Sequence, residues 1–146
     1  MRKWVLVCLS FMAASAALAT PPDPVESQYF ITRRAIFAIT SHDGIKYNLE
    51  LEVKQPFAKP VYAIFEFENP ADPAAPFLAK PKLLPGEPFL VGESEGFRAI
   101  RNPGVYTVRI SFYEDAPRKI LIATHEQKIE FDVPKKYLKV YKVRLL

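Results

Sequence analysis

The sequence predicts an all-β protein: an antiparallel immunoglobulin-like sandwich of about seven to nine strands after a cleaved signal peptide. Three observations predict this fold class. Short β-prone segments alternate with turn residues at intervals of about eight to twelve residues, one segment alternates strictly between apolar and polar side chains, and no helical pattern exceeds about 12 residues. The chain has 146 residues, of which 49% are hydrophobic and 25% charged. This composition is typical of one globular domain and argues against a disordered, collagen-like or multi-span membrane chain.

The first 19 residues have the three parts of an export signal. Arg2 and Lys3 form a short positive region, residues 4–14 form an uncharged apolar run, and residues 17–19 have the small-x-small pattern of a cleavage site. The run is shorter than the roughly 20 residues needed to span a bilayer. We therefore predict cleavage after Ala19 and a periplasmic or secreted protein that is not an integral membrane protein.

Cysteine usage favours a bacterial envelope. Cys8 is the only cysteine and lies within the apolar run, so the mature chain contains no thiol and no disulfide. Secreted animal domains of this size are often stabilised by disulfides. A domain of this length can bury on the order of two-thirds of its unfolded surface, so its core needs no crosslink.

The first half of the mature chain predicts a leader and three strands. Residues 20–28 contain three prolines and form an extended leader, which leaves 29–146 as a single domain. The β-prone segment 29–40, the turn at 41–44 and the alternating segment 45–54 predict a hairpin with one buried and one exposed face. Residues 61–68 predict a third strand.

The segments that follow are shorter and rich in proline. Residues 69–76 hold three prolines and predict a loop that connects the two sheets. Residues 77–84 predict a short edge strand interrupted at Pro81, and 89–91 predict another short strand after a turn at 85–88. Residues 97–100 form a further short apolar piece.

The last third predicts a second hairpin and a terminal strand. Residues 105–113 form a strong strand on which Tyr106, Val108, Ile110 and Phe112 share a face. After a turn at Ala116 and Pro117, the segments 120–124 and 129–133 supply the returning arm. Residues 135–146 complete the domain as a basic C-terminal strand.

The stretch 102–108, Asn-Pro-Gly-Val-Tyr-Thr-Val, resembles the tyrosine corner of immunoglobulin-like domains. In that motif a Gly-x-Tyr sequence starts a central strand, and the tyrosine hydroxyl bonds to a nearby loop backbone. Val108 stands where an antibody domain has its second disulfide cysteine, a departure shared with cysteine-free members of the fibronectin type III type. The resemblance concerns the fold and implies no activity. A lipocalin-like barrel is the alternative.

No residue pattern indicates catalysis, a cofactor or a metal. His42 lies beside Asp43 in a predicted turn, and His125 and Glu126 point to opposite faces of a strand, so neither histidine has converging ligands. The pairs Glu50 with Glu52 and Glu66 with Glu68 fit the solvent faces of amphipathic strands better than a glycosidase site. The serines lack a Gly-x-Ser-x-Gly context, and no phosphate-binding loop is present. We predict that the protein is not an enzyme.

The carboxyl end carries the one anomaly in charge. Residues 20–132 contain 13 basic and 16 acidic residues, whereas residues 133–146 contain five basic residues and no acidic one. Export argues against nucleic acid, but anionic lipids, acidic polymers or an acidic protein remain as partners. An alternative is an edge strand whose lysines prevent aggregation. The predicted partner-binding residues are Lys135, Lys136, Tyr137, Lys139, Tyr141, Lys142 and Arg144.

Together these features predict an exported, non-enzymatic binding or accessory module of the bacterial cell envelope that acts through protein–protein contacts. The predicted contact surface is the basic C-terminal segment or an exposed sheet edge. The alternative function is binding of a small apolar or carbohydrate ligand by aromatic side chains near the proline-rich loops. Those side chains are Phe57, Tyr62, Phe77 and Phe89.

Overall fold

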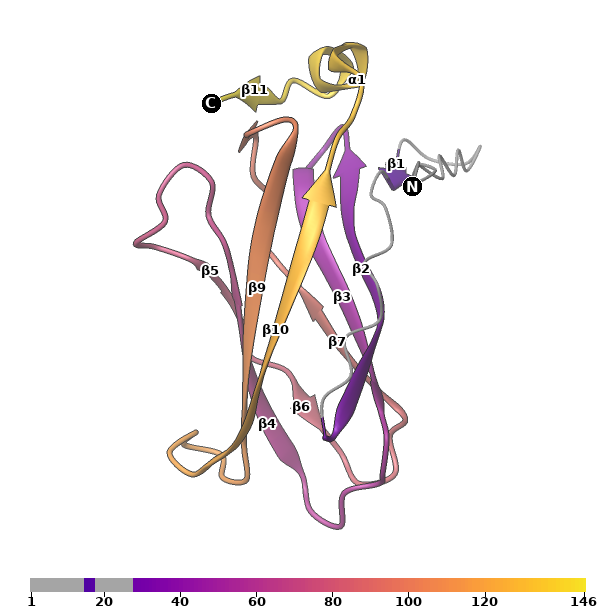
Figure 1. Cartoon of the computed structure of the whole chain (residues 1–146), viewed down its shortest axis with the longest axis vertical. Helices are drawn as coiled ribbons and strands as arrows, with labels where there is room; N and C mark the ends of the chain where they lie inside the picture. The colour runs from indigo at the N-terminus through magenta and orange to yellow at the C-terminus, as the bar shows by residue number, and fades with distance from the viewer. Residues whose placement is uncertain (1–14, 18–27) are drawn as a thin grey trace.

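The computed structural model describes residues 15–17 and 28–146 of the chain (Figure 1). Cys8, the predicted cleavage site after Ala19 and nearly all of the predicted leader lie outside the described residues. The elements are β1 (Ser15–Ala17), β2 (Phe30–Thr40), β3 (Gly44–Val53), β4 (Val61–Phe67), β5 (Phe77–Ala79), β6 (Lys82–Leu83), β7 (Phe89–Glu93), β8 (Ala99–Ile100), β9 (Gly104–Tyr113), β10 (Leu121–Phe131), α1 (Lys135–Val140) and β11 (Arg144–Leu145).

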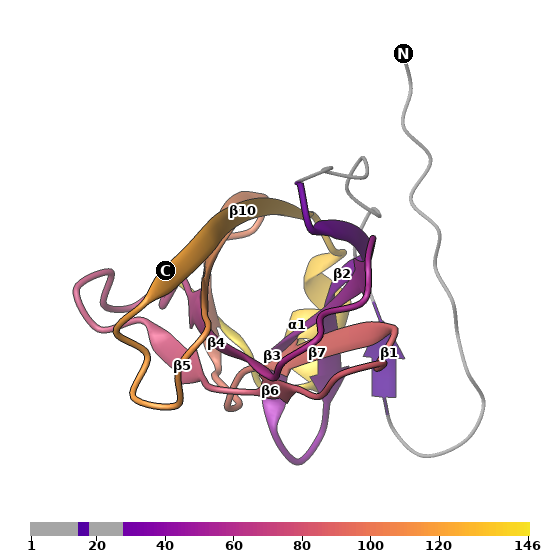
Figure 2. The ribbon, with the colours of Figure 1, turned by 90° about the horizontal axis from the view of Figure 1, so that it is seen from below.

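Two antiparallel sheets form the body of the protein and enclose its core (Figure 2). One sheet has the strand order β1-β2-β3-β7, and the other has the order β10-β9-β4-β5, with β6 also pairing with β4. A parallel pair formed by β8 and β11 lies apart from both sheets. The predicted all-β class with antiparallel sheets is therefore confirmed, in an arrangement compatible with a sandwich.

The predicted hairpin of β2 and β3 forms because the apolar residues of both strands recur at every second position. On β3, Ile45, Tyr47, Leu49 and Leu51 are fully buried, while the polar residues between them face outward. The turn between the strands requires Gly44, whose φ is 80°. A Cβ atom at Gly44 would also lie 2.5 Å from the carbonyl oxygen of Phe97, so the turn packs directly against that segment.

The loop 69–76 does not connect the sheets as predicted. It joins β4 to β5, which are neighbours in one sheet. The chain instead changes sheets at 54–60, at 84–88 and a third time between β7 and β9. Proline content identifies these segments as loops, but it does not tell which loop passes between the sheets. That choice follows from strand pairing, which involves residues far apart in the sequence.

The second hairpin, β9 and β10, closes the larger sheet. The face predicted for β9 is buried as expected, and β4 pairs with its other edge. The returning arm is one continuous strand, with a bulge between Leu121 and Ala123, rather than two short pieces. Inward-facing aromatic rings from both sheets fill the space between them, and Phe37 of β2 contacts four of them: Tyr47, Phe97, Tyr106 and Phe131.

The residues of the resembled motif lie at the entry to β9. Asn102 and Pro103 are joined by a cis peptide bond. The buried hydroxyl of Tyr106 donates a hydrogen bond to the carbonyl oxygen of Arg101, five residues earlier. This is the contact that a tyrosine corner makes. Burial of the ring also raises the pKa of Tyr106 to about 12.

The basic C-terminal segment is not one strand, contrary to the prediction. Residues 135–140 form the helix α1, and only residues 144–145 are extended, in a parallel pair with β8. Leu138 and Val143 are buried at the end of the core. The spacing of these two residues fits a helical turn after which the chain reverses its direction. Their packing against the core outweighs the β-propensity of the tyrosines and valines in this segment.

Candidate functional site

The basic cap, residues 135–146, covers one end of the two sheets. Its helix begins directly after Pro134, whose carbonyl oxygen accepts a hydrogen bond from the Tyr137 amide at 3.0 Å. At the other end Lys142 has a φ of 55°, and the Val143 amide donates to the carbonyl oxygen of Leu138 at 2.8 Å. A left-handed residue followed by this six-to-one bond is a Schellman motif, which ends the helix and turns the chain back onto the body.

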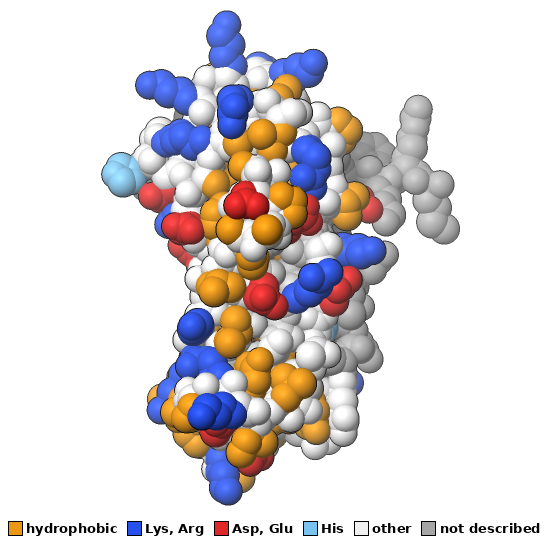
Figure 3. All heavy atoms as spheres, turned by 90° about the vertical axis from the view of Figure 1, so that its left-hand side faces the viewer, with side chains coloured by type: hydrophobic (Ala, Val, Ile, Leu, Met, Phe, Trp, Pro, Cys, Tyr) orange, Lys and Arg blue, Asp and Glu red, His pale blue; other side chains and the backbone are white. Residues whose placement is uncertain are grey.

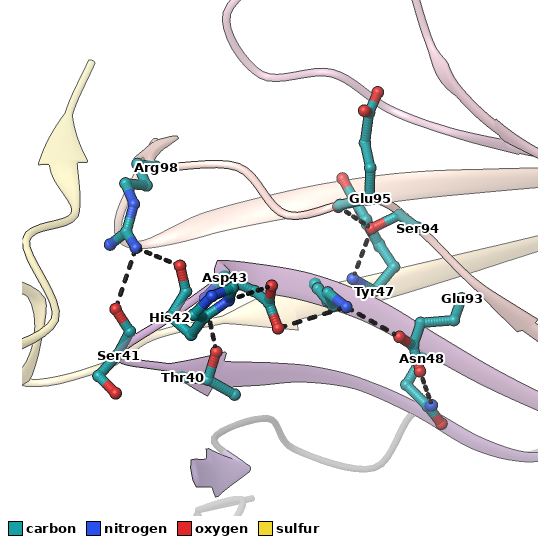
Figure 4. A network of polar contacts seen from close by, with 11 residues as sticks. Thr40, Ser41, His42, Asp43, Tyr47, Asn48, Glu93, Ser94, Glu95 and Arg98 are labelled. Atoms are coloured by element: carbon teal, nitrogen blue, oxygen red, sulfur yellow. Dashed lines mark hydrogen bonds and ion pairs between the residues drawn. The ribbon is translucent and has the colours of Figure 1, made fainter. Parts of the chain in front are cut away.

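Arg98 joins the cap to the first hairpin, and Figure 4 shows its bonds to the hairpin turn at Ser41 and His42. Its guanidinium group donates to the carbonyl oxygens of Ser41 at 3.1 Å, His42 at 2.7 Å and Tyr141 at 2.8 Å. The backbone of Arg98 also accepts a hydrogen bond from the Arg144 amide at 2.7 Å. One side chain therefore links three segments that are distant in the sequence. The sequence contains no signal for this role, because Arg98 lies in a short and unremarkable apolar stretch.

The seven predicted partner-binding residues all lie on the cap, but in two environments. The side chains of the five basic residues are exposed, whereas Tyr137 and Tyr141 are half-buried and pack against the core. The ammonium group of Lys136 lies 5.1 Å from the centre of the Tyr137 ring. The structure thus places the five cations on one surface, whereas the two tyrosines mainly pack against the core. The five basic residues are Lys135, Lys136, Lys139, Lys142 and Arg144.

Within the described part of the chain, no acidic side chain forms an ion pair with these five cations. Figure 3 shows basic side chains gathered at the end that carries α1 and β11, a second basic group at the opposite end, and most acidic side chains between the two. Some cations on the body are paired, such as Arg34 with Glu50 at 3.0 Å and Arg101 with Glu68 at 2.7 Å. The cap is therefore a positively charged surface without local compensation.

The second candidate surface is the outer edge of β2. Residues 15–17 pair with this edge as the antiparallel strand β1, in a register that sets Ser15 opposite Thr40 and Ala17 opposite Ala38. The edge from Ile36 to Thr40 contains no charged residue. Sheet edges of this kind present unpaired backbone amides and carbonyls that accept another strand.

The histidines do not form a site together. His42 is exposed at the hairpin turn and bonds to the Asp43 carboxylate at 3.1 Å, a contact that lowers the pKa of Asp43. His125 is buried, with its Nε2 atom 3.0 Å from Thr32 Oγ1, while Glu126 next to it faces outward, as predicted. Among the described residues, no group of three or more potential ligands could hold a metal ion.

Burial of His125 predicts a specific loss of stability in mild acid. Burial lowers the pKa of the folded imidazole below its ordinary value of 6.5, so the unfolded chain binds this proton more readily than the folded one. We expect the free energy of unfolding to fall as the pH drops from about 7 to about 5. Urea titrations of the wild-type protein and of His125→Gln should show a weaker pH dependence in the variant.

His42→Gln is the matched control, because it removes the same imidazole from an exposed turn instead of from the core. The charged groups near His125 are Glu66, Arg109 and Glu126, which line the same shallow surface hollow. Carboxylates titrate mostly below this pH range. An unchanged slope in His125→Gln would show that His125 does not cause the loss.

The four aromatic residues of the ligand-binding alternative lie apart. Phe57 packs beside Phe30 at a centroid distance of 5.8 Å, and Phe77 stacks on Phe97 at 5.1 Å. Tyr62 lies under Lys82 on the outer face of β4, and Phe89 is 45% exposed on β7. The open hollows described on the outer face of β4, β9 and β10 are lined by other residues, mainly charged and polar.

Three of the four carboxylates in the predicted pairs, Glu50, Glu52 and Glu68, form ion pairs, whereas Glu66 lines the hollows on the outer face of its sheet. Glu50 pairs with Arg34, and Glu68 pairs with Arg101 and accepts a hydrogen bond from the Thr107 amide at 2.9 Å.

In the part of the chain that the structure describes, no helix is long and apolar enough to cross a membrane. No family model, curated protein or solved structure matches the chain.

Proposed function

We propose that this chain is an exported, non-enzymatic binding or accessory module of the bacterial cell envelope that acts through protein–protein contacts. The export pattern of residues 1–19 and the absence of cysteine from the mature chain support the location. The carboxylates and histidines described above serve strand faces, turns and the core, which supports a binding role. The observation that carries the proposal is the strand β1 seated on the outer edge of β2.

We assign the domain to the immunoglobulin-like folds, and to the fibronectin type III arrangement among them. With β5 and β6 taken as one interrupted strand, seven strands divide into a sheet β2-β3-β7 and a sheet β10-β9-β4-β5. The tyrosine corner lies on β9, which is the sixth of these strands and a central one. Both features support the assignment.

The edge of β2 is the contact surface that we propose for the protein partner. If the signal peptide is removed after Ala19, β1 leaves with it and the edge from Ile36 to Thr40 becomes free to accept a strand. The long edge of β10 differs, because Glu126, Lys128 and Glu130 place charges along it. Such charges protect an edge from pairing. An uncharged, extended segment of a partner protein therefore fits β2 better than β10.

Ala38→Lys tests this surface. Ala38 is half-buried on the outer face of β2, where a lysine can reach solvent but obstructs an added strand. The exported protein is crosslinked in its native envelope, and captured polypeptides are identified by mass spectrometry. We expect one specific polypeptide to be captured by the wild-type chain and at least about tenfold less of it by Ala38→Lys, with thermal stability nearly unchanged.

Thr124→Lys on the exposed face of β10 is the matched control and should capture as much partner as the wild-type chain. Equal capture by both variants and the wild-type chain would show that the edge of β2 is not the contact surface. Recovery of a bound small molecule without any polypeptide would contradict the protein–protein proposal and favour the ligand-binding alternative.

A further inference from the structure

We propose that the basic cap, residues 135–146, docks the protein on an anionic lipid surface. This inference concerns a surface different from the edge of β2, and it does not depend on a protein partner. It rests on three described properties of the cap: uncompensated positive charge, exposed apolar side chains beside that charge, and a fixed attachment to the body.

The positive charge of the cap is concentrated and unpaired. Five cations lie within ten residues, from Lys135 to Arg144, and no acidic residue follows Asp132 in the sequence. Some cations on the body are paired, for example Arg33 with Glu52 and Lys46 with Glu93. Each lysine or arginine that lies close to an anionic membrane raises the binding constant by a factor on the order of five. The charge on the cap is therefore complementary to such a surface.

Exposed apolar side chains lie among these cations. Val140 is 68% exposed, Leu146 is 52% exposed and Leu145 is 41% exposed. Exposed apolar groups beside cations contribute little to binding a soluble polyanion, but they enter the boundary between headgroups and acyl chains of a lipid layer. Lysines suit the same boundary, since their methylene chains lie along apolar surface while the ammonium groups contact phosphates. The combination favours a lipid surface over a nucleic acid or an acidic polymer.

The attachment of the cap would give the docked protein a defined orientation. Arg98 bonds to the backbone of Tyr141 and to the hairpin turn at Ser41 and His42. Leu138 is buried, so the helix presents its cations outward from a side anchored in the core. In Figure 1 the cap and β1 lie at the same end of the molecule. A docked cap would therefore hold the edge of β2 near the membrane surface.

The test is vesicle co-sedimentation of the exported protein. We expect it to bind vesicles containing about three parts phosphatidylglycerol to seven of phosphatidylcholine, and not vesicles of phosphatidylcholine alone. Binding should weaken as salt rises from about 0.05 M to about 0.5 M. A fourfold variant of the cap should bind at least about tenfold more weakly. Its substitutions are Lys135→Gln, Lys136→Gln, Lys139→Gln and Lys142→Gln.

A second fourfold variant, matched in net charge, controls for the loss of charge in general and should keep most of the binding. Its substitutions, all at exposed lysines outside the cap, are Lys59→Gln, Lys80→Gln, Lys82→Gln and Lys119→Gln. Circular dichroism checks that all variants remain folded. Equal loss of vesicle binding in both variants would overturn a specific role of the cap.

The apolar contribution separates a lipid surface from other anions. Val140→Ser combined with Leu146→Ser should weaken vesicle binding at least about threefold, yet leave retention on a soluble polyanion such as heparin unchanged. The proposal would be overturned if the protein failed to bind anionic vesicles. It would also be overturned if the two substitutions left vesicle binding unchanged and inorganic phosphate fully displaced the protein from the vesicles. Neither result affects capture through the edge of β2, so the two proposals fail independently.

Discussion

Replacing Phe37 by alanine should lower the free energy of unfolding by about 3–5 kcal/mol. Phe37 is completely buried between the two sheets. Its ring centre lies 4.6 Å from that of Tyr47 on its own sheet, and 5.3 Å and 5.0 Å from those of Tyr106 and Phe131 on the opposite sheet. Truncation leaves a cavity where the sheets meet, and rings held by strands cannot move in to fill it.

This loss is large against the 5–15 kcal/mol that stabilises an ordinary domain. Urea denaturation followed by tyrosine fluorescence measures it. Phe89→Ala is the matched control: the same atoms are removed from a ring that is 45% exposed on β7, and we expect a loss below about 1 kcal/mol. Similar losses in both variants would show that the aromatic cluster around Phe37 is not the centre of the core.

Tyr106→Phe should lower the free energy of unfolding by about 1–3 kcal/mol, although the aromatic ring is kept. The substitution removes the hydroxyl that donates to the Arg101 carbonyl oxygen. That hydroxyl belongs to a buried side chain, so water cannot easily replace it. The guanidinium of Arg101 also lies 4.9 Å from the ring centre and pairs with Glu68, so this corner ties the entry of β9 to the end of β4.

Tyr113→Phe provides the comparison, because Tyr113 is half-buried on the outer face of β9. We expect its effect to stay within about 0.5 kcal/mol. Thermal unfolding monitored by circular dichroism reports both variants. If Tyr106→Phe were as stable as the wild-type protein, the hydrogen bond from the Tyr106 hydroxyl to Arg101 would not stabilise the fold.

Period-two patterns predicted most of the strands. The alternation of Ile45, Tyr47, Leu49 and Leu51 is a local property, because neighbouring side chains in a strand point to opposite faces whatever the strand packs against. The same reasoning identified the buried face of β9 and the opposite orientations of His125 and Glu126. Turn chemistry at Gly44 and the motif around Tyr106 were likewise readable, since each depends on a few adjacent residues.

Composition alone also located the candidate cap, because an excess of cations is visible without any structure. Its conformation was not predictable in the same way. Tyr137, Val140 and Val143 favour strands, yet residues 135–140 are helical, since burial of Leu138 and Val143 at the end of the core outweighs local preference.

The sequence by itself thus determined the all-β class, the positions of the main strands and the excess of positive charge at the carboxyl end. Only the tertiary structure decided which loops pass between the sheets, that the edge of β2 accepts residues 15–17 as a strand, and that Arg98 anchors the cap. The physical reason is range. Side-chain alternation and charge are local properties. The pairing of β1 with β2 instead joins residues 21 to 25 positions apart, and the carbonyl contacts of Arg98 join residues 43 to 57 positions apart, so local propensity does not determine them.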